Sequence, residues 1–537
     1  MIVDAFHEFV GNMTPSALFP DPGQKYVVDI TPAVMLPFTL HGFFLEHSST
    51  IITTIGLILV GFLTLKSVSP GNVLPGVPEL KGVPILGAMP IYLKHGMPQL
   101  LGRLIDIGDD GISYANVMNN VLVSVHDPGM VREVLSYPEE IASREGDPGR
   151  MSWSPFWTLR RLIGNSLFNY VGPETSHQRN VFIREFNNTK SNAQKFETIT
   201  KVATNHANAL TGNGTTAEVD DIRYSADNFA IALWGETLYG NPHHHVGGRV
   251  LSLSETIINL AGDPWPSVWY SVQLFLKLVT PGEPTRSEAN LRAKVSKVVE
   301  RNIGKLEEYE RNNPDAPLKT IRNLSVMTGG GRTGPLSKFA SEFTNLNLFG
   351  GHHSIGLNVT WSLIELDKHP ECLAKLMAEI NSVDTNDFTQ VNSKMPYLDA
   401  VIMEINRLHP TVHATLRVIN RETKLAASKK PVVLKPGMLI YLSYLHLHTS
   451  PKFWGPDAGV FVPEGFLGGY NKDQPFMSFG YGPRNCVGYK FATLAAKVYL
   501  LTLLKTYQID VKEHDHEMRL GTLLETTKPV GVRVTRH

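Results

Sequence analysis

Apolar residues recur at helical spacing through most of the chain after residue 90. This pattern predicts a mainly helical fold, because positions three and four apart share one face of a helix. Short runs with the character of strands occur at residues 121–125 and 431–444, and they predict small β-sheets beside the helices. No second linker or repeat interrupts residues 91–537. We therefore expect one large, mainly α domain over this range.

An uncharged apolar run covers residues 48–65, SSTIITTIGLILVGFLTL. A helix of about 18 residues is near the minimum that spans the hydrocarbon layer of a membrane. The threonines and glycines of the run also suit a buried core helix, but we interpret it as a transmembrane anchor. Lys66 and Lys81 follow the run, whereas the dozen residues before it include Glu46 and no lysine or arginine. This asymmetry predicts a single-pass protein of the endoplasmic reticulum membrane with its large C-terminal part in the cytosol.

The segments on either side of the anchor follow from this orientation. Residues 1–47 would lie in the lumen, where Asn12 of the sequon Asn12-Met13-Thr14 could carry a glycan and make the chain a glycoprotein. Residues 66–90 contain regularly spaced prolines between glycines, which predicts a stiff, extended hinge because proline cannot continue a helix.

Composition and charge narrow the class of protein. The 537 residues include 50 basic and 50 acidic side chains, so the net charge gives no reason to expect nucleic acid as a partner. Only two cysteines occur, Cys372 and Cys486, so the sequence contains no disulfide framework. The large domain is therefore expected to face a reducing compartment.

A glycine-rich loop at residues 479–488, FGYGPRNCVG, surrounds Cys486. Glycine lets a backbone turn tightly and approach a flat group that a Cβ would obstruct. A lone cysteine is often only a small buried apolar residue. A phosphate-binding loop is the other alternative, but no Lys-Ser or Lys-Thr pair follows the glycines. We interpret the loop as a haem-thiolate site with Cys486 as the axial ligand of the iron.

The loop resembles the cysteine signature of the cytochrome P450 family, Phe-x-x-Gly-x-Arg-x-Cys-x-Gly. It matches every fixed position, namely Phe479, Gly482, Arg484, Cys486 and Gly488. The resemblance, which covers roughly residues 70–537, implies a cytochrome P450 fold and haem b (iron protoporphyrin IX) bound through Cys486. It also implies that Phe479 shields the sulfur and that Gly480 and Gly488 lie beside the haem. A thiolate ligand pushes electron density onto haem iron and favours O–O cleavage.

The resemblance implies three arginines as ligands of the haem propionates. Arg484 lies in the loop itself, and Arg417 lies where the family places a propionate-binding arginine. Residues 172–179, GPETSHQR, resemble the family's C-helix pattern and end on Arg179. In this pattern Thr175 replaces a tryptophan, which puts one propionate contact in doubt.

Residues 336–368 are expected to form one long helix, which ends at His369-Pro370 because the residue before proline disfavours helix. Gly350 and Gly351 in its middle each cost about 1 kcal/mol relative to alanine, so a reason for them is needed. The distal I helix of the family resembles this segment and supplies one, since small residues there make space for O₂.

In the same comparison, His353 takes the position of the family's acid and Ser354 that of its alcohol. Both are therefore candidate catalytic residues, because imidazole, with an ordinary pKa of about 6.5, can carry protons near neutral pH. The alternative is a histidine that is merely hydrogen-bonded inside a helix bundle.

The remaining motifs concern the side of the haem where the cysteine lies. Glu404 and Arg407 are three residues apart on a predicted helix and resemble the family's structural Glu-x-x-Arg pair. Residues 453–466 resemble its meander, but Gly465 replaces an arginine that completes a charge network with this pair. We expect a less supported proximal side. On the predicted helix 491–504 and just before it, Lys497 and Lys490 are candidates for a basic surface that meets a reductase.

By family implication the chain is a monooxygenase that takes electrons from NADPH through a cytochrome reductase and inserts one oxygen atom of O₂ into a lipophilic substrate. Membrane attachment suits terpenoids, sterols or polyketides, and the departures from the family motifs suggest a tailoring step in secondary metabolism, of the microsomal and fungal type. The altered His353-Ser354 pair motivates an alternative, a haem-thiolate isomerase, dehydratase or bond-coupling enzyme that needs no reductase. A haem sensor or carrier without catalysis is a third interpretation.

Overall fold

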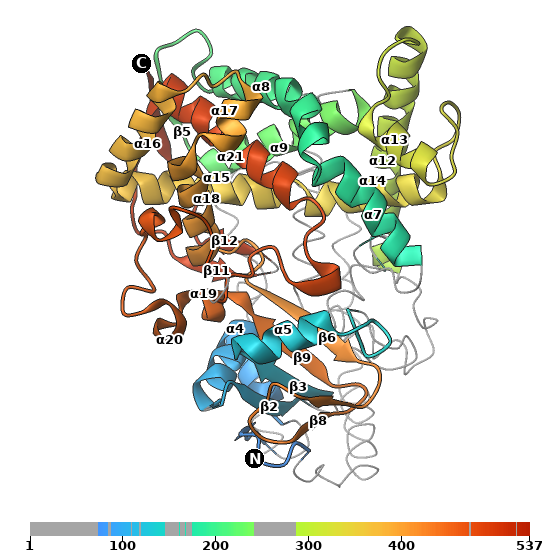
Figure 1. Cartoon of the computed structure of the whole chain (residues 1–537), viewed down its shortest axis with the longest axis vertical. Coiled ribbons are helices and arrows are strands. Elements are labelled where there is room, and N and C mark those ends of the chain that lie inside the picture. The colour runs from blue at the N-terminus through green and yellow to red at the C-terminus, as the bar shows by residue number, and fades with distance from the viewer. Residues whose placement is uncertain are drawn as a thin grey trace, which may run out of the picture. The chain divides into compact units, whose positions relative to one another are not determined.

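Among the residues that the computed structural model describes, helices predominate and small sheets lie beside them (Figure 1). The structure describes residues 73–83, 87–108, 110–117, 120–144, 161, 167, 174–240, 286–471, 474–521 and 523–537. These residues belong to one compact unit, Asn72–His537. The prediction of a mainly α fold with small β-sheets is confirmed.

The main helices follow the predicted apolar periodicity. They are α4 (Met89–Ile107), α5 (Pro128–Ser136), α7 (Glu174–Phe186), α8 (Thr189–Thr211), α9 (Ile222–Tyr239), α12 (Arg286–Asn312), α13 (Thr320–Met327), α14 (Lys338–Gly350), α15 (His353–Lys368), α16 (Pro370–Ser382), α17 (Phe388–Ser393), α18 (Pro396–Leu408), α19 (Tyr444–Thr449), α20 (Pro451–Trp454) and α21 (Tyr489–Thr506). Two short 3₁₀ helices, η3 (Pro463–Phe466) and η4 (Gly482–Arg484), lie in the segment between α20 and α21.

The strands form one mixed sheet and three small ones. They are β1 (Glu79–Leu80), β2 (Ile112–Val117), β3 (Asn120–Val125), β4 (Ala142–Ser143), β5 (Thr216–Val219), β6 (Ala414–Ile419), β7 (Thr423–Leu425), β8 (Val432–Leu434), β9 (Leu439–Ser443), β10 (Tyr507–Val511), β11 (Met518–Leu520), β12 (Leu524–Thr526) and β13 (Val532–Arg536). The largest sheet has the order β1-β2-β3-β9-β6-β4. The two predicted strand regions correspond to β3 and to β8 with β9, and the other strands carried too weak a pattern to be predicted.

The centre of the helical part is α15, which packs against α9 and α21 (Figure 1). Almost every residue of α15 between His353 and Leu366 is buried, so this helix is covered on all sides. The rings of Phe229 on α9 and Tyr499 on α21 stack with centroids 4.0 Å apart. These contacts fix α9 along one side of α15, next to the start of that helix.

The predicted long helix over residues 336–368 is two helices in the structure. α14 ends at Gly350 and α15 begins at His353. The interruption falls at the pair of glycines that a continuous helix could not explain. Glycine loses more conformational freedom than other residues when it is held in a helix, so a helix is less stable at these positions. The expectation of one continuous helix is thus corrected, and the glycines mark the interruption.

Part of the expected hinge over residues 66–90 is folded onto the sheet. Leu74 and Val77 are buried against the apolar side chains of the large sheet. β1 then pairs in parallel with β2, and α4 begins at Met89. The described residues before residue 91 therefore already take part in the packing of the large sheet.

The predicted anchor at residues 48–65, the segment 1–47 and Asn12 lie outside the described residues. Among the residues that the structure does describe, none of the helices combines the length and the apolar character that crossing a membrane requires.

Candidate functional site

The loop around Cys486 is shaped by its own backbone. The N–H of Cys486 donates to the carbonyl oxygen of Phe479 at 2.7 Å. Gly480 and Gly482 have φ angles of +75° and +69°, in the left-handed region that favours glycine. A Cβ on Gly482 would lie 2.5 Å from the carbonyl oxygen of Leu135. The tight turns at Gly480 and Gly482 place Cys486 three residues before the start of α21 at Tyr489.

Gly488 differs from the other two glycines. Its φ angle is −108°, which any residue adopts, and an added Cβ would meet no atom of the described chain within 4 Å. Any need for glycine at this position therefore lies in a group that binds beside the loop. The ring of Phe479 lies 5.8 Å from that of Tyr489, the first residue of α21.

The side chain of Cys486 is accessible to solvent and yet surrounded by protein. Its surface is exposed, although the chain around it is dense enough for burial to raise the pKa of the thiol. The backbone N–H of Gly488 and the charges of Arg179 and Arg144 act in the opposite direction. A side chain can be exposed and still have dense protein around it when it lines a hollow inside the fold. We interpret the position of Cys486 in this way.

Two of the predicted arginines are buried and have no acidic partner among the described residues. Arg179 is 8% exposed and donates to the backbone and side-chain oxygens of Asn485, at 2.6 and 3.0 Å. Arg417 is 4% exposed and donates to the carbonyl oxygen of Leu416 at 2.8 Å and to Thr415 Oγ1 at 3.3 Å. In the part of the chain that the structure describes, neither guanidinium contacts a carboxylate. Since a buried charge costs free energy unless it is paired, the site calls for an anion.

Arg484 and a fourth arginine complete the cluster. Arg484 forms an ion pair with Glu139, and its carbonyl oxygen accepts a hydrogen bond from Arg144 at 3.1 Å. Arg144 directly follows β4, which pairs with β6 so that Ser143 lies opposite Val418, and the same register brings Arg144 next to Arg417. Burial and then the charge of Arg417 lower the pKa of Arg144 to about 9. Sequence reasoning missed Arg144, because only the pairing of two distant strands places it here.

The Glu404-Arg407 pair lies behind the loop, in the interior. Arg407 Nε and Nη2 donate to the two carboxylate oxygens of Glu404, both at 2.7 Å, and both side chains are almost fully buried. Arg407 also donates to the carbonyl oxygens of Ala458 and Val460, at 2.5 and 3.0 Å. Glu404 accepts from the N–H of Val462 at 2.8 Å. The pair therefore fastens the segment after α20 to α18.

Comparison with known proteins agrees with this geometry. A family model described as Cytochrome P450 matches residues 77–534. The chain belongs to the cytochrome P450 family. Members of this family bind haem iron, O₂ and an electron donor, and this P450 is accordingly a monooxygenase of the oxidoreductase class.

Individual relatives are distant. The P450 is 24% identical to "Cytochrome P450 CYP72A616" of Paris polyphylla over 444 residues. This match covers 81% of this chain and 82% of that protein. It is 28% identical over 275 residues to "Probable cytochrome P450 313a4" of Drosophila melanogaster, over 49% of this chain and 53% of the fly protein. A third match, 30% identical over 177 residues, is "Secologanin synthase 2" of Catharanthus roseus, over 32% of this chain and 33% of that protein.

The residues at the site fit a haem. Cys486 is exposed and feels the charge of Arg179, and neither Arg179 nor Arg417, both buried, contacts a carboxylate among the described residues. These groups match the needs of a thiolate-bound iron porphyrin with two propionates. When bound, haem supplies the reductive activation of O₂, and the chain supplies its position and surroundings.

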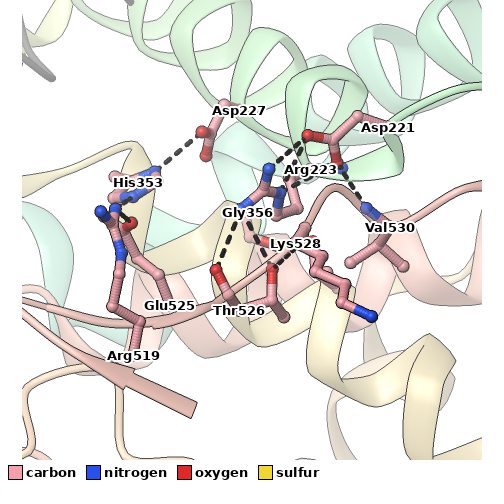
Figure 2. A network of polar contacts seen from close by, with 11 residues as sticks. Asp221, Arg223, Asp227, His353, Gly356, Arg519, Glu525, Thr526, Lys528 and Val530 are labelled. Carbon is pink, nitrogen blue, oxygen red and sulfur yellow. Dashed lines mark hydrogen bonds and ion pairs between the residues drawn. The ribbon is translucent and has the colours of Figure 1, made fainter. Parts of the chain in front are cut away.

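The candidate catalytic residue His353 lies between two carboxylates. Its Nδ1 donates to Asp227 Oδ2 on α9 at 2.8 Å, and its Nε2 donates to Glu525 Oε1 on β12 at 3.1 Å (Figure 2). Glu525 also forms an ion pair with Arg519 of β11. The network thus joins α15 to α9 and to the β11–β12 hairpin. Sequence reasoning did not find Asp227 and Glu525, because neither belongs to a local motif.

The carboxylates keep His353 charged. Burial alone would lower the pKa of this imidazole, but Asp227 and then Glu525 outweigh it and raise the pKa to about 10. Burial likewise works against the ionised form of Glu525, yet His353 and Arg519 lower its pKa to about 2. At neutral pH His353 is therefore an imidazolium and not the neutral imidazole that its ordinary pKa suggests.

This charge state predicts how the stability of the protein depends on pH. The contribution of His353 to the free energy of unfolding should be complete below its ordinary pKa of 6.5 and be lost as the pH rises to about 10. That of Glu525 should be complete above 4.5 and be lost as the pH falls to about 2. The free energy of unfolding, measured with denaturant, should thus differ most between the wild type and His353→Gln between pH 4.5 and pH 6.5, where both contributions are complete. Above pH 6.5 this difference should shrink by about 1.4 kcal/mol per pH unit. A difference that does not change between pH 6 and 9.5 would contradict the assigned charge.

Ser354, the other candidate catalytic residue, is half-buried on the first turn of α15. Its hydroxyl lies 3.5 Å from the carbonyl oxygen of Gly350, which is a long hydrogen bond. The hydroxyl can therefore turn toward another partner at little cost.

Two expectations about the proximal side change. Lys497 does not belong to an exposed basic surface, because it is 3% exposed and its Nζ lies 2.8 Å from Asp399 Oδ1 on α18. Lys490 is exposed. Gly465 lies in open space, and the pair Glu404-Arg407 holds the neighbouring segment through backbone groups, which limits what the missing arginine costs.

Proposed function

We propose that this P450 inserts one oxygen atom from O₂ into a lipophilic substrate of the terpenoid, sterol or polyketide type, as a tailoring step in secondary metabolism of a microsomal, fungal kind. The observation that carries the proposal is the exposed Cys486 in its glycine-rich loop, together with the buried Arg179 and Arg417, which contact no carboxylate among the described residues. Relatives named "Secologanin synthase 2" and "Cytochrome P450 monooxygenase claP" support a biosynthetic role.

The proposed electron source is NADPH through a cytochrome reductase, and the proposed location is the endoplasmic reticulum membrane. Residues 48–65 would cross the membrane, 1–47 would lie in the lumen with a glycan on Asn12, 66–90 would contain the hinge, and 91–537 would form the cytosolic haem domain. Protease treatment of sealed microsomes should remove the haem domain and spare the segment that carries the glycan.

The test of the activity is NADPH consumption by the full chain with a reductase and a panel of lipophilic substrates. Substrate-dependent NADPH use with an oxygenated product supports the proposal. Turnover without reductase would instead favour an isomerase, dehydratase or bond-coupling enzyme.

For the reaction itself, we propose that Ser354 and His353 deliver protons at the oxygen-binding side. His353 holds a proton on each ring nitrogen, and the ion pair between Glu525 and Arg519, which is 57% exposed, connects it toward solvent. A proton that His353 releases would be replaced from water through the Glu525 carboxylate, because the guanidinium of Arg519 does not give up its own proton. Ser354, one residue further, would orient the accepting group.

His353→Ala should therefore uncouple electron use from product formation, because the proton supply is lost while electrons still arrive. We expect product per NADPH to fall by roughly 10²-fold, within the usual range for a lost acid or base, and hydrogen peroxide to rise. His514→Ala is the control, since that histidine is 58% exposed and lies outside the network. Unchanged coupling in His353→Ala would leave His353 with a packing role only.

A further inference from the structure

The interruption between α14 and α15 frees one particular backbone carbonyl group. In a continuous α-helix, the carbonyl oxygen of Gly351 would accept the N–H of Ile355, four residues later. In the structure that N–H donates to His352 instead, at 3.0 Å, and Gly356 donates to the same oxygen at 3.1 Å. The Gly351 carbonyl has therefore lost its helical donor. Gly351 is half-buried, so a carbonyl in this state favours a partner from elsewhere in the chain.

Trp234 of α9 supplies that partner. Its indole Nε1–H donates to the Gly351 carbonyl oxygen at 2.7 Å. The indole is half-buried, and its ring packs against Phe186 and Phe491 with centroids 5.4 and 5.0 Å away. A ring held on two sides by other aromatic rings has little freedom to move, so the donor is fixed in place before the carbonyl meets it.

Asp227, on the same helix as Trp234, contacts the first residue of α15, His353. Asp227 lies two helical turns before Trp234, so both side chains project from one face of α9. Asp227 holds His353 Nδ1, and its Oδ1 is so close to α15 that a Cβ on Gly356 would lie 2.0 Å away. α9 thus contacts Gly351 within the interruption and His353 and Gly356 after it.

We infer that Trp234 is a positioning residue that keeps the distal helix interrupted at Gly351–His352 and thereby sets where His353 and Ser354 stand. Without the indole N–H, the Gly351 carbonyl either stays unpaired or returns to Ile355. The return to Ile355 would shift the first turn of α15, and an unpaired carbonyl would leave the interruption without the contact that holds it in place. The link to catalysis rests on the proposed function of His353 and Ser354, whereas the structural role of Trp234 does not.

The experiment compares Trp234→Phe with the wild type in the haem-loaded full chain. Phenylalanine keeps an aromatic ring at the site and removes the donor. Amide hydrogen exchange in the segment 350–356 should change at least severalfold, and product formed per NADPH should fall by about 10- to 100-fold, since small displacements of positioned groups have effects of this size. The reduced carbon monoxide spectrum should keep its thiolate-type band, which shows that Cys486 and the haem are intact.

Trp361→Phe is the matched control. Trp361 lies on α15 and is 1% exposed, and its Nε1 has no hydrogen-bond partner in the part of the chain that the structure describes. This variant loses a similar ring volume without the loss of a donor, so exchange in 350–356 should stay as in the wild type. Trp234→His, which keeps a ring N–H, is the second variant and should exchange more like the wild type than Trp234→Phe does.

Unchanged exchange in Trp234→Phe, or an equal change in Trp361→Phe, overturns the inference. So does a Trp234→His protein that exchanges as Trp234→Phe does. Altered exchange with unchanged coupling has a different meaning. It would support the structural role of Trp234 and would contradict the proposed proton delivery by His353 and Ser354.

Discussion

Replacing Cys486 with alanine should abolish the thiolate-type absorption band of the reduced, carbon monoxide-bound protein and reduce monooxygenase activity by far more than about 100-fold. Outer-sphere changes at metal sites commonly cost 10- to 100-fold, and this change removes the protein ligand itself. The loop around the residue should persist, because Gly480 and Gly482 form its turns through backbone geometry and the Cys486 N–H still donates to Phe479. The measurement is the reduced difference spectrum beside an assay with NADPH and reductase.

The other cysteine provides the control for this experiment. Cys372 is buried on α16, 4% exposed, and its thiol donates to Glu371 Oε1 at 3.7 Å. Cys372→Ala removes the same atoms from a different place and should keep both band and activity. If Cys486→Ala retains a thiolate-type band, or if Cys372→Ala loses it, the assignment of Cys486 as axial ligand is wrong.

The second large effect is expected for Glu404→Gln. This change leaves the buried guanidinium of Arg407 without its bidentate partner, and breaking a buried pair in this way commonly costs about 3–5 kcal/mol of folding free energy. It also weakens the bond that Glu404 accepts from Val462. Because the segment held by the pair leads into the cysteine loop, we expect little haem-loaded protein to accumulate. The yield of haem per chain and the thermal midpoint of unfolding measure the effect.

An exposed pair with the same spacing is the control for Glu404→Gln. Lys305 and Glu308 are also three residues apart on a helix, with their charged atoms 2.6 Å apart, but about half of each side chain is exposed. Glu308→Gln should leave the midpoint and the haem content unchanged, since water replaces the lost contact. Equal losses in both variants would show that burial of Glu404-Arg407 does not matter.

The proximal site contrasts with the distal network in how its charges are balanced. Arg179 and Arg417 are buried cations without a carboxylate partner among the described residues, whereas His353 is a buried cation between two carboxylates of the chain. Haem binding should accordingly stabilise the protein, because its propionates would pair with charges that the described part of the fold leaves without an acid.

Local patterns in the sequence were sufficient for much of this description. The loop with Cys486 is encoded in ten consecutive residues, and the helical spacing of Glu404 and Arg407 is enough to place both on one face. The mainly α fold follows from the apolar periodicity for the same reason, since each helix is specified by residues a few positions apart. Short strands such as β1 and β4 could not be predicted, because each of them exists only through pairing with a strand far along the chain.

The tertiary structure alone decided the surroundings of these residues. The sequence was sufficient to place His353 at the distal helix. Its charge depends on Asp227 and Glu525, which lie on α9 and β12, far from it along the chain. Arg144 joins the arginine cluster only through the pairing of β4 with β6, and Trp234 reaches Gly351 only because α9 packs along α15. A local pattern specifies which groups a segment carries. Their pKa values, their partners and the ends of the distal helices depend on contacts between segments, and these form only when the chain folds.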